Sequence, residues 1–219
     1  MKQKGLGQEG LKILACVTML IDHIGVVLLP WNVLRVIGRL AFPIYCFLLA
    51  EGIHHTHDSK KYGLRLLFGV LLAEIPFDLL FFGHLTWAHS SVMVTLFLGF
   101  LYGMSSRQVR QLGHKILLVL PFMILADLLS ADYGGWGVAM MAMFMLTREH
   151  PKKHLIQIVA LILLCWMIGG ISIQLFAVVA LIPIFCYSGR KCASNRWVQW
   201  AFYMFYPVHL VVLLWIGRF

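Results

Sequence analysis

Nine apolar runs follow one another along the chain, and they constrain its fold more than any other feature. Most approach the length of about 17–25 residues that an α-helix needs to cross a bilayer. Because 61% of the residues are hydrophobic and only 12% are charged, a soluble domain of 219 residues could not bury these runs. We therefore predict an all-α, polytopic integral membrane bundle that forms one domain over residues 1–219. The runs are residues 11–29, 33–53, 62–82, 91–104, 114–130, 133–146, 154–168, 171–187 and 197–216.

Basic residues gather in every second loop between these runs. Because Lys and Arg accumulate on the cytoplasmic side of membrane proteins, this alternation predicts about nine crossings of a bacterial cytoplasmic membrane. It also puts the N-terminus in the cytoplasm and the C-terminus outside. The short fourth, sixth and seventh runs leave eight or ten crossings open. Short clusters of this kind also argue against a nucleic-acid partner. The clusters are Lys2, Lys4 and Lys12; Lys60, Lys61 and Arg65; Arg107, Arg110 and Lys115; Arg148, Lys152 and Lys153; and Arg190, Lys191 and Arg196.

Ionisable residues in five of the runs lie at a similar depth, about 18–21 Å from the cytoplasmic side at the rise of an α-helix. Since charged groups in lipid need partners, we predict that the helices converge on a polar pocket. Asp22 and His23 are neighbours and point about 100° apart on a helix, so His23 is expected to meet a carboxylate of another helix, such as Glu74. The five residues are His23, Arg39, Glu74, Asp127 and His209.

Two other interpretations of this polar layer stay open at this point. The first is a structural network of ion pairs that fixes helix packing. The second is a proton- or ion-coupled transporter that uses the same buried His, Glu and Arg side chains.

The cytoplasmic end of the second run, residues 51–57, contains three histidines. Only His54 and His57 have a spacing that places them on one helical face, so we predict no metal site. Lys61 and Arg65 follow closely, and together these groups form a cationic mouth suited to a ligand that carries phosphate.

A series of motifs in order along the chain resembles the TraX family, which is named for the conjugative pilin acetylase. The resemblance covers nearly the whole chain, and the family is similar in plan to the larger acyltransferase-three membrane enzymes. The motifs are Leu11-Lys12-Ile13, Ile21-Asp22-His23-Ile24-Gly25, Arg35-x-x-Gly38-Arg39, Glu51-Gly52, His55-Thr56, Tyr62-x-x-Arg65, Glu74-x-Pro76-Phe77, Asp132-Tyr133-Gly134 and Phe205-Tyr206-Pro207-x-His209.

The resemblance implies a membrane acetyltransferase that takes its acetyl group from cytoplasmic acetyl-CoA. The acceptor would be an amine, such as a peptide N-terminus, or a hydroxyl of a glycan or small molecule. The cationic mouth would hold the CoA phosphates. The residues expected to bind the donor are Glu51, His55, Thr56, Lys61, Tyr62 and Arg65.

The resemblance and the polar layer together assign roles in the reaction. His23 is the expected general base, oriented by Asp22 or Glu74. Arg39 would bind the acceptor or stabilise the oxyanion, and His209 would be a second acid–base group or a wall of the pocket. An acyl-histidine intermediate is the alternative to direct transfer.

Overall fold

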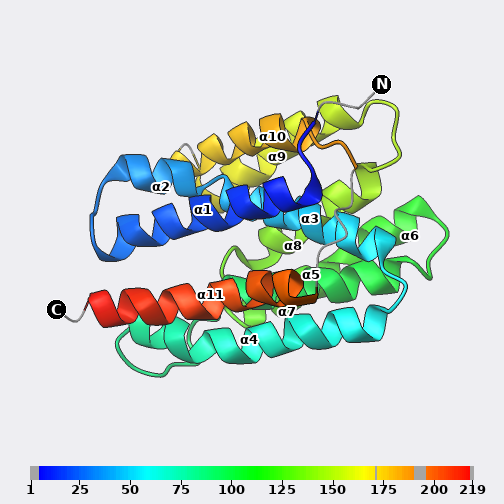
Figure 1. The fold of residues 1–219 in the computed structure, drawn as a ribbon. Coiled ribbons are helices and arrows are strands. Elements are labelled where there is room, and N and C mark those ends of the chain that lie inside the picture. Colours follow the sequence, from blue (N-terminus) through cyan, green and yellow to red (C-terminus); the bar gives the residue numbers. More distant parts are fainter. Residues whose placement is uncertain (1–4, 171, 190–195, 218–219) are drawn as a thin grey trace.

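The computed structural model describes residues 5–170, 172–189 and 196–217. Within these ranges the regular structure is helical, which confirms the all-α part of the predicted fold class (Figure 1). The elements in chain order are α1 (Gln8–Val27), α2 (Asn32–Gly38), α3 (Ala41–His55), α4 (Ser59–Phe81), α5 (Val92–Ser106), α6 (Leu112–Leu117), α7 (Val119–Leu128), α8 (Gly134–Thr147), α9 (Lys153–Gly169), η1 (Ile173–Ala180), α10 (Leu181–Phe185) and α11 (Arg196–Ile216).

Each of the nine predicted runs coincides with one helical rod. Three rods are broken into two pieces, namely α2 with α3, α6 with α7, and η1 with α10. Pro43 lies in the first turn of α3, where a missing N–H costs no helical hydrogen bond, so it starts a new helix after the break. The break leaves Arg39 at the junction of α2 and α3.

The outer surface of the bundle is apolar. On α4, the side chains of Leu64, Phe68, Leu71 and Ile75 follow one another at helical spacing and are all exposed. A continuous stripe of this kind is what contact with lipid requires. Among the described residues, three helices are long and apolar enough to cross a membrane, and four shorter apolar helices accompany them. The three are Gln8–Val27, the combined rod Asn32–His55, and Trp197–Ile216.

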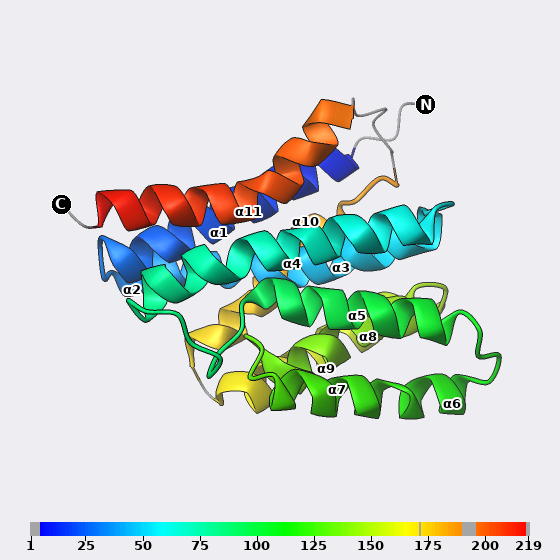
Figure 2. The same cartoon turned by 90° about the horizontal axis from the view of Figure 1, so that it is seen from below.

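The rods run roughly along one direction, so their ends form two faces (Figure 2). The start of α1, the α3–α4 turn and α6 lie at one face. The end of α11, the α1–α2 turn and the α4–α5 loop lie at the opposite face. The basic clusters that are described therefore share one end of the bundle, which we call the basic end. Its assignment to the cytoplasm and the number of crossings stay predictions. The basic residues Lys2, Lys4, Arg190 and Lys191, and the side chain of Arg196, lie outside the described residues.

Candidate active site

Two pockets lie in line inside the bundle. The basic pocket has a volume of about 340 Å³ and is lined from the basic end by α1, α3, α4, α5 and α11. The histidine pocket has a volume of about 370 Å³ and is lined toward the opposite end by α1, α2, α3, α4, the start of α5 and the loop before α8. Met19, Tyr45 and Val92 line both pockets, so the pockets adjoin at these three side chains, which we call the neck.

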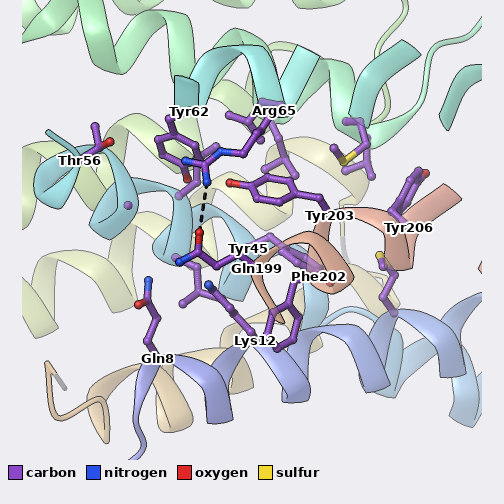
Figure 3. Close-up of a pocket in the computed structure, with 18 of the residues that line it drawn as sticks. Gln8, Lys12, Tyr45, Thr56, Tyr62, Arg65, Gln199, Phe202, Tyr203 and Tyr206 are labelled. Atoms are coloured by element: carbon purple, nitrogen blue, oxygen red, sulfur yellow. Dashed lines mark hydrogen bonds between the residues drawn. The ribbon is translucent and has the colours of Figure 1, made fainter. Parts of the chain in front are cut away.

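Arg65 is the central cation of the basic pocket (Figure 3). Its guanidinium donates a hydrogen bond to the side-chain oxygen of Gln199 at 3.2 Å and lies over the rings of Tyr62 and Tyr203. On the other wall, the Lys12 ammonium lies 5.2 Å from the centre of a phenylalanine ring on α11. The pocket thus combines positive charge with aromatic faces.

Four of the six residues predicted to bind the donor line this pocket. They are His55, Thr56, Tyr62 and Arg65. Tyr62 approaches α3 closely because Gly52 has no side chain, and a Cβ there would lie 2.6 Å from the Tyr62 hydroxyl.

The other two predicted donor-binding residues do not line the pocket. Glu51 is buried and accepts a 2.7 Å hydrogen bond from Arg148, and it also lies 3.4 Å from His55. Lys61 is exposed and pairs with Asp58 at 3.0 Å. The Lys61 backbone amide, followed by its ammonium, lowers the pKa of Asp58, which caps α4. Each group already has an ionic partner, and direct binding of the donor by Glu51 and Lys61 stays a prediction.

The histidine pocket contains a salt-bridge network. Asp22 is buried and accepts two hydrogen bonds of 2.8 Å from Arg39 and one of 3.2 Å from Arg35. Gly38 makes this contact possible, because a Cβ at that position would lie 2.2 Å from the Asp22 side chain. Asp22 and His23 point to different partners, as their helical spacing predicts, so Asp22 does not orient His23.

Arg39 and Arg35 differ in what they have left to donate. Arg39 makes five hydrogen bonds, to both carboxylate oxygens of Asp22, the Arg35 carbonyl, Tyr133 and Gln174, and both bonds to Asp22 come from the same nitrogen. The role of Arg39 in binding an acceptor or oxyanion stays a prediction. Arg35 makes one side-chain hydrogen bond, is partly exposed and lines the pocket.

His23 meets His209 and not a carboxylate. Its Nδ1 lies 2.6 Å from His209 Nε2, across the α1–α11 interface. His209 is buried, and its Nδ1 lies 2.7 Å from the Phe205 carbonyl oxygen. The sequence correctly placed the two histidines at one level, but it did not pair them.

Glu74 and Asp127 lie away from His23. Glu74 accepts hydrogen bonds from the hydroxyl and the backbone amide of Ser91, at 2.6 and 3.1 Å, at the start of α5. Asp127 accepts a 2.7 Å hydrogen bond from the amide of Gly135. Both carboxylates thus serve backbone groups at helix starts, and the predicted His23–Glu74 pair is wrong.

Sequence reasoning missed several residues of the two pockets. Arg35, Asp132 and Tyr133 line the histidine pocket, and Lys12 and Tyr203 line the basic pocket. Arg35 and the Asp132-Tyr133 pair stand within motifs that were visible in the sequence. Hydrogen bonds between Ser90 and residues 130–132 fold the loop before α8 against the loop before α5. These bonds bring Asp132 and Tyr133 into the pocket.

Comparison with known proteins adds a family match. A family model described as TraX protein matches residues 7–217, a range that contains every candidate site residue. "Probable fimbrial assembly protein FimC, serogroup H1" of Dichelobacter nodosus is 30% identical over 231 residues, which cover 93% of this chain and 92% of that protein. "Uncharacterized protein RP591" of Rickettsia prowazekii (strain Madrid E) is 30% identical over 155 residues, covering 68% of this chain and 58% of that protein. No solved structure matches the chain.

Proposed function

The chain belongs to the TraX family, and from this premise we propose that it is a membrane-embedded acetyltransferase that moves an acetyl group from acetyl-CoA to an amine or hydroxyl acceptor. The observation that carries the proposal is the pair of pockets joined at one neck. One pocket offers Arg65, a cation without a direct ion pair among the described residues, and the next offers an imidazole with an arginine beside it.

The basic pocket fits an anionic donor with an aromatic base. Arg65 and Lys12 supply charge for phosphates, and the rings of Tyr62 and Tyr203 supply faces for stacking. A flexible thioester arm bound here would extend past Tyr45 at the neck, and its reactive end would then lie toward His23.

The histidine pocket fits the transfer step. His23 takes the proton from the acceptor's N–H or O–H as the acceptor atom bonds to the thioester carbonyl carbon. The carbon–sulfur bond then breaks, and the proton on His23 passes to the CoA thiolate. Arg35 donates to the oxyanion that develops on the carbonyl oxygen, because it makes one side-chain hydrogen bond where Arg39 makes five. Asp22 and Arg39 hold Arg35 in place.

The acceptor is best matched by an amine on a peptide. The D. nodosus relative is named a probable fimbrial assembly protein, and this name favours a protein as the acceptor. Phe77, Phe81 and Phe82 give the histidine pocket an aromatic wall against which an apolar peptide end can pack.

The proposal is tested with purified full-length protein in detergent. Acetyl-CoA should raise its melting temperature, and acetylpantetheine, which has the thioester arm but no nucleotide, should raise it less at the same concentration. Failure of every acyl-CoA to stabilise the protein would contradict the proposal. Radiolabelled acetyl-CoA added alone then separates two routes. Label that stays on the wild-type protein and is lost in His23→Ala indicates an acyl-histidine, and absence of label indicates direct transfer.

A further inference from the structure

The two histidines are joined edge to edge. Their ring planes differ by only 4° and their ring centres are 4.9 Å apart, while His23 Nδ1 and His209 Nε2 are separated by 2.6 Å. The distance between the ring centres exceeds the distance between the two nitrogens by about one ring diameter, which is the sum of the two centre-to-nitrogen distances. Both nitrogens therefore lie near the line between the ring centres. This is the geometry of an in-plane N–H···N hydrogen bond, not of rings stacked face to face.

The partner of His209 decides which nitrogen carries the proton. The Phe205 carbonyl can only accept, so His209 Nδ1, at 2.7 Å, must donate. A neutral His209 then has a lone pair at Nε2 and can only accept from His23. His23 Nδ1 is therefore protonated, and its lone pair is at Nε2. That Nε2 has no hydrogen-bond partner among the described residues.

We propose that His209 is a positioning residue that holds His23 in the Nδ1–H tautomer, through a hydrogen-bond relay that starts at the Phe205 carbonyl. This inference rests on the proposed function for its consequence, since the tautomer leaves Nε2 as the atom that takes the acceptor's proton. A neutral relay also suits this pocket, because Asp22, the carboxylate next to His23 in the chain, is already bound by Arg35 and Arg39. His209 thus does for His23 what a carboxylate does in many acid–base sites.

The tautomer is measured directly by nitrogen NMR on full-length protein labelled at histidine, in detergent micelles and at a pH well above the ordinary histidine range. The chain has 10 histidines, so the His23 signals are assigned by their loss in His23→Gln. We expect the Nδ1–H form in the wild type. In His209→Phe, which keeps a ring and removes the acceptor, we expect the population to move toward Nε2–H.

Activity provides the second readout. His209→Phe should lower kcat by about 10²-fold with little change in the KM for acetyl-CoA, because positioning of the base is lost and donor binding is not. His209→Gln should stay within about tenfold of the wild type, since its amide can accept from His23 and donate to the Phe205 carbonyl. His154→Phe is the matched control, because His154 of α9 packs on Phe185 of α10, outside both pockets.

The outcomes separate this inference from the proposed function. An Nε2–H form in the wild type, or a His23 tautomer that is the same in His209→Phe, would overturn the relay. If His209→Phe does not fold, His209→Gln decides, because a Gln variant with the activity loss expected of Phe also contradicts the relay. Absence of acetyl transfer by the wild type would contradict the proposed function, and the NMR result would still decide the tautomer.

Discussion

The two pockets handle positive charge in opposite ways. In the basic pocket, the partners of Arg65 are a neutral amide, the Lys61 carbonyl and two ring faces, and no ion pair to a carboxylate joins it within the described part of the chain. In the histidine pocket, Arg39 makes five hydrogen bonds and Asp22 is held by two arginines.

This difference suits the basic pocket to binding a ligand and the histidine pocket to holding reacting groups in position. An uncompensated cation attracts a mobile anion and loses little when the anion leaves. A compensated ion-pair network costs more to disturb, and it holds its members in one geometry. In the histidine pocket, the groups left open are Arg35 and the Nε2 of His23. The variants below change one pocket at a time.

The largest effect is expected from His23→Ala. Removal of the base should lower kcat by about 10³-fold, within the range for general base catalysis. The rise in melting temperature with acetyl-CoA should be unchanged, because His23 does not line the basic pocket. Radiolabel transfer and thermal unfolding measure the two quantities. His114→Ala, which removes an exposed histidine of α6, is the control. Loss of acetyl-CoA binding in His23→Ala would show that the two pockets are not separable.

Arg35→Gln and Arg39→Gln should divide the histidine pocket into a reacting and a supporting arginine. We expect Arg35→Gln to lower kcat by about 10²-fold while the fold persists, since one oxyanion donor is worth about that much. Arg39→Gln should instead destabilise the protein by about 3 kcal/mol, because it leaves Asp22 underpaired in a buried site. Thermal unfolding and initial rates measure both. A stable, inactive Arg39→Gln beside an active Arg35→Gln would reverse the assignment.

The helical rods were predictable because apolar length is a local property of the sequence. The partners within the bundle were not. Depth along a helix places His23 and Glu74 at one level, but the rotation of each helix decides what they meet, and α4 turns Glu74 toward Ser91 at the start of α5. Likewise, Arg35 and Arg39 are four residues apart in the sequence. Only the close packing of Asp22 against Gly38 shows that Arg39 makes two hydrogen bonds to Asp22 and Arg35 makes one. The hydrogen bond between His23 and His209 could not be predicted, because two neutral histidines have no complementary charges that would indicate a pair.

Arg65→Gln should weaken acetyl-CoA binding about tenfold, because one charge-assisted contact to phosphate is lost. Binding by the wild type should weaken as salt rises, and this dependence should become shallower in the variant. Lys61→Gln is the matched control, since Lys61 is a neighbouring cation that pairs with Asp58 and does not line the pocket. Isothermal titration at two salt concentrations measures both variants. Equal losses in the two would mean that general surface charge, not the basic pocket, attracts the donor.

The smallest expected effect concerns the wall of the basic pocket. In Gly52→Ala the new Cβ would lie 2.6 Å from the Tyr62 hydroxyl, so the Tyr62 ring must move within the pocket. Because that ring lies beside Arg65, we expect acetyl-CoA affinity to fall by a few fold, with kcat at saturating donor unchanged. Gly113→Ala is the matched control, since no atom lies within 4 Å of its added Cβ. A Gly52→Ala variant that lowers kcat and leaves donor affinity intact would mean that Tyr62 acts on the histidine pocket, and the division between a binding pocket and a reacting pocket would then fail at the neck.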